Sequence, residues 1–244
     1  MADGPQDGPQ LELRQASPAD LGDVARIFSA TVLLGAPVAL GARAMARYRA
    51  LCLDWYADAD PADGGGIVAL EDGAVRGYLL YCLDHAAFVR WQRTAALRWA
   101  AGELAATAAG RRGRDDRRFL RLRLTDGLAS LQGTPPAPYP AHAHFNLDPQ
   151  VRGRSTGHRL AAAMDARVAA RGYDGWFGEM NLPVGFPTDA LERAGAELGH
   201  RQRNVTLSAL TGMDVWRTTV LRPLAGRTGA FHARAAGARA EVAA

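Results

Sequence analysis

The stretch AHAHFNLDPQVRGRSTGHRL, residues 141–160, changes character twice along its length. Residues 141–148 alternate apolar and polar side chains, which is typical of a strand with one buried face. Residues 149–157 are rich in Pro, Gly, Arg and Ser, which is typical of a loop. A helical pattern then runs to about Arg171, and Gly172 is a C-cap signal. The segment therefore predicts a strand, a loop and a helix in succession.

The loop of this segment has the chemistry of a phosphate-binding turn. A turn that opens a helix presents several backbone N–H groups in one direction, and the helix dipole adds positive charge there. Gly153 and Gly157 allow a ligand to approach the backbone, and Arg152, Arg154 and Arg159 add charge suited to phosphate. The loop lacks the Gly-Lys-Ser/Thr ending of a Walker loop, and Gly-x-Gly-x-x-Gly cannot be fitted. The alternative is an Arg/Gly loop that opens a helix and binds no ligand.

The elements before this segment follow from local signals. Residues 67–84 predict a hairpin around the turn Asp72-Gly73. Ser17, Pro18 and Asp20 have the spacing of a helix N-cap with a capping box. The other predicted elements are a strand at 11–16, helices at 21–32 and about 38–57, and a chain break at Gly64–Gly66.

The rest of the chain completes a mixed α/β pattern. Helical spacing over 85–109 and the arginine-rich run 111–123 predict a helical insertion at about 85–130. Later segments predict strands at 175–180, 197–209 and 215–222 and a short helix at 188–195. We expect one domain over 11–224 with tails at 1–10, disordered, and 225–244, flexible. This order predicts a central sheet with flanking helices.

Composition excludes several classes of protein. The chain carries 29 basic residues, all of them arginine, against 25 acidic ones, so no lysine is available for Schiff-base chemistry. The two cysteines, Cys52 and Cys82, have no metal or disulfide spacing. No run of about 18 apolar residues is present, which argues against a membrane span. The first ten residues lack the pattern of a secretory signal, so we expect a cytoplasmic protein. The cysteine spacing leads us to expect no metal site.

Residues 149–157 resemble motif A of the GNAT superfamily of N-acetyltransferases. Pro149, Arg152, Gly153 and Gly157 match the pattern Pro-x-x-Arg-Gly-x-Gly-x-Gly, and Ser155 stands where the family usually has glycine. The resemblance extends over about 11–224. It implies a mostly antiparallel central sheet with one splayed strand pair, flanked by helices.

A second segment of the chain falls in register with the same family. Glu179 and Gly195 match, whereas Val184 and Leu191 stand where members often have Asn and Tyr. In the family that tyrosine often protonates the departing thiolate. Leu191 cannot do so, and Tyr139 or Ser155 are the substitutes that the sequence offers.

The resemblance implies that acetyl-CoA, as co-substrate, lies between strands 141–148 and 175–180. Backbone N–H groups of 153–158 would hold its pyrophosphate, and the backbone near Leu147 would meet the pantetheine arm. The residues expected to bind the co-substrate are Leu147, Arg152, Gly153, Arg154, Ser155, Thr156, Gly157 and His158.

Three side chains are candidates for acid–base work. His142 and His144 share one face of their strand with Asn146, and an imidazole titrates near neutral pH. Glu179 lies on the neighbouring strand. Each histidine has the alternative of facing packing or solvent, and Glu179 that of a structural role. The predicted catalytic residues are Glu179, His144 and His142.

These observations predict an acetyl-CoA-dependent N-acyltransferase that moves acetyl to a primary amine of a small molecule. One alternative is a catalytically weak CoA-binding regulatory module, which Ser155, Val184 and Leu191 would favour. A second is an aminoacyl-tRNA-linked transferase, suggested by the arginine-rich run. We expect no membrane partner, and a homodimer is common in the resembling family.

Overall fold

The computed structural model describes residues 11–36, 40–133, 139–152 and 155–224. The predicted tails at 1–10 and 225–244 lie outside the described residues. Seven strands form one sheet in the order β1-β2-β3-β4-β5-β7-β6. The strands are β1 Leu11–Gln15, β2 Gly64–Glu71, β3 Ala74–Cys82, β4 Ala141–Leu147, β5 Gly175–Pro183, β6 Glu197–Arg203 and β7 Val215–Pro223.

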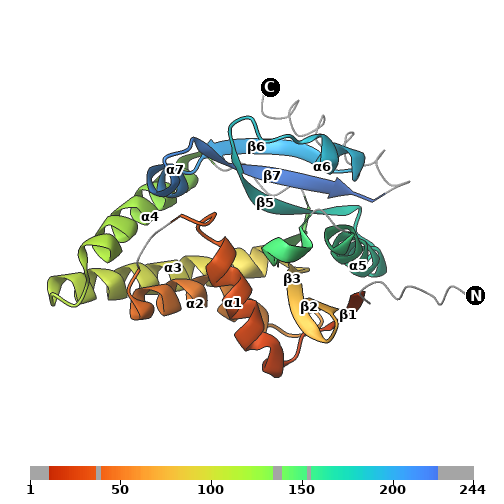
Figure 1. Ribbon diagram of the computed structural model, residues 1–244, viewed down its shortest axis with the longest axis horizontal. Helices are drawn as coiled ribbons and strands as arrows, with labels where there is room; N and C mark the ends of the chain where they lie inside the picture. The colour runs from red at the N-terminus through yellow and green to blue at the C-terminus, as the bar shows by residue number, and fades with distance from the viewer. Residues whose placement is uncertain (1–10, 37–39, 134–138, 153–154, 225–244) are drawn as a thin grey trace, which may run out of the picture.

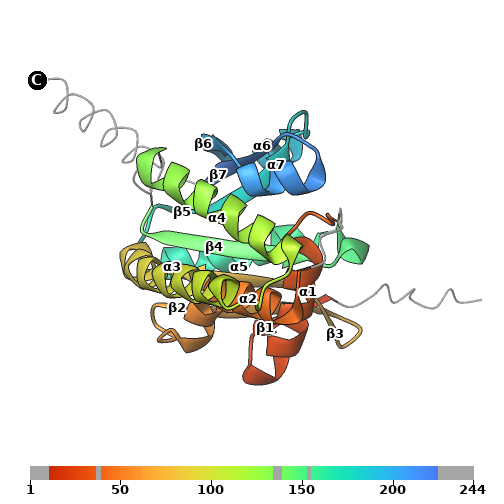
Figure 2. The same ribbon diagram turned by 90° about the vertical axis from the view of Figure 1, so that its left-hand side faces the viewer.

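Helices cover both faces of this sheet (Figures 1 and 2). Only β4 and β5 run parallel, and all other neighbouring pairs are antiparallel. The predicted fold class, a mostly antiparallel sheet flanked by helices, is therefore confirmed. The helices are η1 Pro18–Asp20, α1 Leu21–Thr31, α2 Ala42–Asp58, α3 His85–Ala108, α4 Arg114–Gly133, η2 Pro149–Val151, α5 Thr156–Ala170, α6 Asp189–Arg193 and α7 Val205–Thr211.

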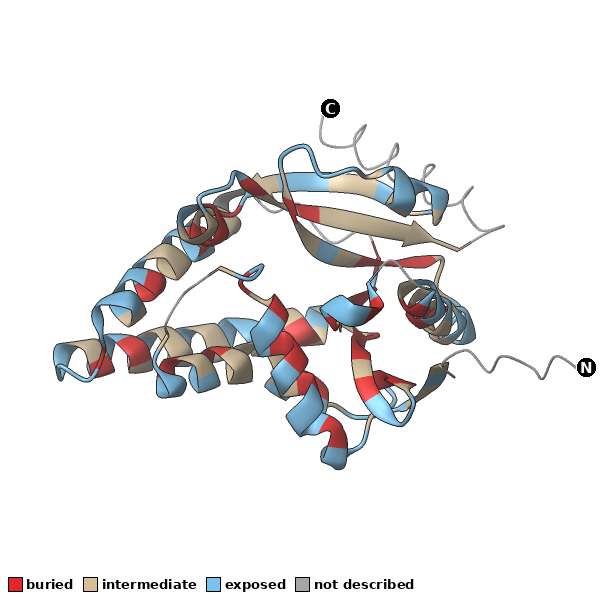
Figure 3. Cartoon of the chain, viewed as in Figure 1, coloured by how far each residue is buried: buried red, intermediate tan, exposed pale blue. Residues whose placement is uncertain are grey.

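Two clusters of buried apolar side chains pack against the two faces of the sheet, and Figure 3 colours the buried residues red. On one face α1 and α2 pack Phe28 and Tyr48 against Tyr78 of β3. On the other face α5 packs Leu160 and Met164 against strands β2–β5. Strands β2 and β3 are thus buried on both faces over most of their length, as their nearly continuous apolar sequences require.

The predicted elements at the N-terminal half hold with one correction. Asp72 and Gly73 both have positive φ, as the two-residue hairpin turn requires. Ser17 and Asp20 form the predicted capping box. The glycine run does not break the chain, because Gly64–Gly66 belongs to β2 and pairs with β3. Trp55 explains the first glycine, since a Cβ on Gly64 would lie 2.6 Å from its ring.

The C-terminal prediction is wrong in one element. Residues 197–209 were expected to form one strand, but β6 ends at Arg203 and α7 follows. Asn204 begins this helix, because its side-chain oxygen accepts from the backbone N–H of Leu207 at 2.9 Å. Gly212 ends it in the left-handed conformation.

The insertion over 85–130 forms α3 and α4, and a buried carboxylate fixes their joint. Glu103 of α3 is 3% exposed and contacts one arginine of the joint and one arginine of α2. Arg112 donates to it at 2.5 and 2.9 Å, and Arg47 of α2 lies 2.7 Å away. From this joint α4 rises to α7, on the far half of the sheet (Figure 1).

Candidate active site

The sheet is split between β4 and β5. Their parallel ladder contains only Ala141 paired with Trp176 and His142 paired with Phe177. Beyond these pairs the described strands diverge, whereas β4 stays paired with β3 to its last residue, Leu147. This is the predicted splayed pair, and its open end lies at the carboxyl end of β4.

Helix α5 begins at this open end. The first helical hydrogen bond here runs from Arg159 to Ser155, so the backbone N–H groups of 156–158 have no partner in the helix. Ser155 is the N-cap, and its side chain makes no capping hydrogen bond. The N–H groups and the dipole of α5 therefore favour an anion beside the end of β4.

The structure places most of the predicted co-substrate residues around this point. Arg152 is exposed, and its Nε donates to the carbonyl of Leu147 at 3.4 Å. Thr156 is buried and His158 is exposed. A Cβ on Gly157 would touch Leu147 at 3.6 Å, so helix and strand are close there. Gly153 and Arg154 lie outside the described residues.

Arg159 was predicted to add positive charge to the loop, but the structure places its side chain elsewhere. Its guanidinium donates to the carbonyl of Leu11 in β1 at 2.7 Å. The side chain therefore ties α5 to the edge of the sheet, and Arg152 is the described arginine of the motif that stays beside the split.

His142 lies at the point where the two strands separate, in a chain of polar contacts. Its Nε2 is 2.8 Å from the hydroxyl of Tyr56, and its Nδ1 is 3.0 Å from Nδ1 of His85. Burial lowers the pKa of His142 well below its ordinary value, and His85 and His144 add to the effect. The tautomers of the two rings are therefore linked, because only one Nδ1 of the pair can carry the shared proton.

His144 lies one pleat further along the open part of β4, on the same face. Asn146 donates to its Nε2 at 3.1 Å and to the hydroxyl of Tyr78 at 2.7 Å. Burial lowers the pKa of His144 to about 4. The imidazole is thus neutral near pH 7, and its basicity is weaker than that of a general base matched to the working pH. The chemistry that fits His144 best is hydrogen bonding in its neutral form.

This pKa predicts acid sensitivity of the fold with a definite sign. A histidine in the unfolded chain takes up a proton near pH 6.5, whereas His144 in the folded chain does so only near pH 4. Between these values the unfolded state binds more protons than the folded state. The contribution of neutral His144 to stability is therefore fully present above pH 6.5 and declines toward pH 4.

When the pH falls from 7 to 5, we expect the free energy of unfolding of His144→Gln to decrease by about 1–2 kcal/mol less than that of the wild type. Urea unfolding at the two pH values measures this difference. His200, which is exposed, gives the control variant His200→Gln, for which the wild-type loss should persist. If the stability of His144→Gln and of the wild type changed equally with pH, the lowered pKa assigned to His144 would be wrong.

Glu179 occupies the opposite side of the split, on the same face of the sheet as Phe177. Its side chain is 46% exposed, and its carboxylate lies 3.7 Å from Nε of Arg217 on β7. That distance is an ion pair rather than a short hydrogen bond. The carboxylate therefore remains accessible to a further partner, on the face toward which the two histidines also point.

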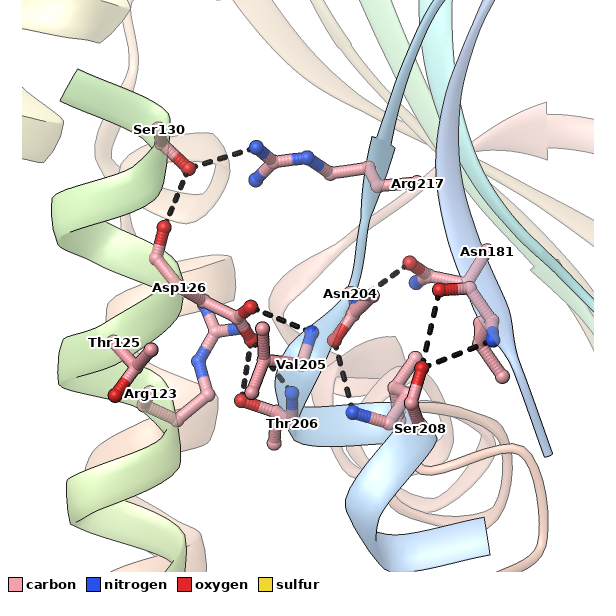
Figure 4. Close-up of polar contacts among 12 residues, drawn as sticks. Arg123, Thr125, Asp126, Ser130, Asn181, Asn204, Val205, Thr206, Ser208 and Arg217 are labelled. Carbon is pink, nitrogen blue, oxygen red and sulfur yellow. Dashed lines mark hydrogen bonds and ion pairs between the residues drawn. The ribbon is translucent and has the colours of Figure 1, made fainter. Parts of the chain in front are cut away.

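Helix α4 adds polar groups to this face that the sequence did not predict as a site (Figure 4). Ser130 accepts from Arg217 at 2.7 Å. One turn earlier, Asp126 is buried and accepts from the backbone N–H groups of Val205 at 2.8 Å and Thr206 at 3.0 Å. The Thr206 hydroxyl also donates to Asp126. The insertion is thus joined to the second half of the sheet, beside Glu179.

The two substitutes for a general acid differ in position. Tyr139 is buried against Gly175, where a Cβ would lie 2.7 Å from its ring. It therefore lies at the paired end of β4 and β5. Ser155 lies at the open end, beside α5. Leu191, at the usual tyrosine position, belongs to α6.

Among the described residues, no group of three or more His, Cys, Asp and Glu side chains is arranged to hold a metal ion. None of the described helices is long and apolar enough to cross a membrane.

Solved structures resemble this chain in fold. The structure of SsHAT is 21% identical and has a TM-score of 0.55, with 88% of this chain and 98% of that chain covered. A GCN5-related N-acetyltransferase from Kribbella flavida is 16% identical, with a TM-score of 0.49 over 88% and 98% of the two chains. A GNAT-superfamily phosphinothricin acetyltransferase from Sinorhizobium meliloti, in complex with acetyl-CoA, is 21% identical, with a TM-score of 0.47 over 88% of each chain. No family model and no curated protein matches the sequence. The predicted resemblance is confirmed at the level of the fold.

Proposed function

We propose that this chain, which has the GNAT fold, is an N-acyltransferase that moves acetyl from acetyl-CoA to a primary amine of a small molecule. The observation that carries the proposal is the split between β4 and β5 with the start of α5 at its open end. A split exposes backbone groups of β4 that an extended amide-containing arm can pair with. The backbone N–H groups at the start of α5 suit the pyrophosphate of the same molecule.

The chain's own residues would then divide the work across the split. Arg152 and the N–H groups of 156–158 hold the phosphates. Glu179 receives the proton of the attacking amine, since its carboxylate is accessible. His144 and Asn146 orient the acceptor side by hydrogen bonds in their neutral forms. The thioester supplies the acyl group, and its thiolate leaves without the usual tyrosine.

Calorimetric titration with acetyl-CoA, in parallel with S-acetylpantetheine, tests the binding half of this proposal. We expect micromolar affinity for acetyl-CoA and at least tenfold weaker binding of the analogue without pyrophosphate. Release of free thiol on addition of a library of primary amines tests the transfer half. Equal affinity for the two compounds would overturn the assignment of α5.

Leu191 favours one alternative, a CoA-binding regulatory module with weak catalysis. Such a module would gain melting temperature with CoA and release no thiol with any amine. The tRNA-linked alternative loses support, because several arginines of the run 111–123 make internal contacts. Arg112 pairs with Glu103, and Arg118 donates to the carbonyl of Ala209 at 2.9 Å. Retention on immobilised RNA with a steep salt dependence would restore it.

Arg152→Ala is expected to weaken acetyl-CoA binding about 10- to 100-fold, because one charge-assisted phosphate contact is lost. Calorimetry measures the change. Arg193→Ala, an exposed arginine of α6, is the matched control and should bind as the wild type does. Unchanged affinity in Arg152→Ala would remove this residue from the phosphate site.

The location and assembly of the protein are further predictions. We propose a cytoplasmic location, and we infer a homodimer from the resemblance to the GNAT superfamily. Sedimentation of the purified chain at micromolar concentration tests the dimer, and a monomer would contradict it.

A further inference from the structure

A run of arginines such as 111–123 is typical of a solvated charged face, but Arg123, at its end, points inward. The Arg123 side chain is 28% exposed, and its guanidinium carbon lies 5.4 Å from the centre of the Tyr48 ring. Its nearest carboxylate oxygen belongs to Asp126, at 3.5 Å. Among the described residues, Arg123 makes no hydrogen bond. Its guanidinium has five N–H donors, so most of its bonding capacity is unused.

Asp126 does not satisfy this arginine, because its oxygens are engaged elsewhere (Figure 4). The carboxylate accepts from two backbone N–H groups at the start of α7 and from the Thr206 hydroxyl. It acts as a cap for α7, and the longer contact to Arg123 adds only an ion pair. The Arg123 guanidinium is thus held by a ring contact and an ion pair, and its partly exposed N–H donors are open to an anion.

Arg123 faces the proposed acceptor side. Ser130 lies seven positions further along α4, on the same helical face, and contacts Arg217, the ion-pair partner of Glu179. The pKa of Arg123 is raised by the Tyr48 oxygen and, in smaller part, by charges that include Glu179. The helical spacing therefore places Arg123 on the same face of α4 as Ser130, which contacts the ion-pair partner of Glu179.

The charges of this face select the kind of amine that fits. Glu179 and Asp126 carry two negative charges, and Arg123 and Arg217 carry two positive ones. Arg217 donates from Nη2 to Ser130 and to Gln202, at 2.7 and 2.6 Å, and its Nε forms the ion pair with Glu179, so it is already held by three partners. A simple ammonium would leave one excess positive charge on the face. An ammonium that carries its own anion leaves none and satisfies the open donors of Arg123.

We propose that the acceptor is a primary amine with an anionic group, carboxylate or phosphonate, and that Arg123 binds this group while the amine faces Glu179. The proposal rests on the proposed acyltransferase function and narrows its substrate class. Arg123 would then be a specificity-determining residue supplied by the insertion, since α4 carries it.

Matched pairs of amines test this directly. L-Phenylalanine is paired with 2-phenylethylamine, and 2-aminoethylphosphonate with ethylamine, in the thiol-release assay with acetyl-CoA. We expect kcat/KM to be at least tenfold higher for the anionic member of a pair, and the two pairs distinguish carboxylate from phosphonate. Arg123→Gln should lower kcat/KM for the anionic member about 10- to 100-fold and change the plain amine less than threefold.

Two further variants keep the test independent of folding. Arg121→Gln removes an exposed arginine of the same helix and should leave the preference intact. Arg123→Lys keeps the charge without the planar fork and should retain part of the preference. Circular dichroism and melting temperature establish that each variant is folded. A preference for the plain amines, or an equal loss for both members in Arg123→Gln, would overturn the proposal.

Failure of acetyl transfer itself is a separate outcome. If no amine releases thiol, calorimetry of the same paired compounds without acetyl-CoA still tests Arg123. Binding of the anionic member to wild type and at least tenfold weaker binding to Arg123→Gln would support the site even though the acyltransferase function had failed. Equal binding to both proteins, or no binding to either, would overturn it.

Discussion

Replacing Glu179 by Gln is expected to lower kcat for acetyl transfer by about 100- to 10,000-fold, the usual contribution of a general base. The amide keeps the size of the side chain but cannot take the proton of the attacking amine. The carboxylate lies on β5 and pairs only loosely with Arg217, at 3.7 Å. The affinity for acetyl-CoA should therefore change less than threefold. Steady-state thiol release and calorimetry measure the two quantities.

Glu12→Gln is the matched control for this experiment. Glu12 is an exposed acid on β1, at the far edge of the sheet, so its replacement should leave kcat unchanged. If Glu179→Gln retains wild-type kcat over pH 6–9, the base must lie elsewhere and our assignment of Glu179 is wrong.

Asp126→Ala is expected to lower the free energy of unfolding by about 3–5 kcal/mol, because it breaks a buried charged network. The change leaves two backbone N–H groups of α7 and the Thr206 hydroxyl without their acceptor. It also leaves the charge of Arg123 without its ion-pair partner. Equilibrium unfolding in urea measures the loss.

Two variants bracket the effect of Asp126. Asp126→Asn keeps one carbonyl oxygen as an acceptor and should lose less than the alanine variant. Asp115→Ala removes an exposed acid from the first turn of the same helix and should cost less than about 1 kcal/mol. Equal, small losses for Asp126→Ala and Asp115→Ala would show that α4 is not held by this contact.

The parts of the fold that the sequence predicted are those with local signals. The turn Asp72-Gly73 and the capping box of Ser17 and Asp20 are written within a few residues. Helix α7 was missed because Val205 and Thr206 are β-branched and its length is only 7 residues. Its start depends on Asp126, 80 positions away for Thr206, and no local pattern reveals such a partner.

The candidate site shows the same division. Strand alternation placed His142 and His144 on one face, and the structure agrees. Their partners Tyr56 and Tyr78 come from other elements, so the loss of basicity by burial could not be predicted. Arg123 could not be told apart in sequence from the exposed arginines around it. Its helical spacing from Phe119, a core residue, was the signal available for an inward face.

The short ladder between β4 and β5 also has a mechanical consequence. Two residue pairs are the whole backbone ladder between the half-sheet β1–β4 and the half-sheet β5–β7–β6 in the described chain. A second connection runs outside the sheet, along α3 and α4 to the start of α7. The halves are therefore joined at two separate points, so both the ladder and the helices α3 and α4 restrain their relative rotation. The stiffness of this helical connection sets how far the split widens when a molecule enters it.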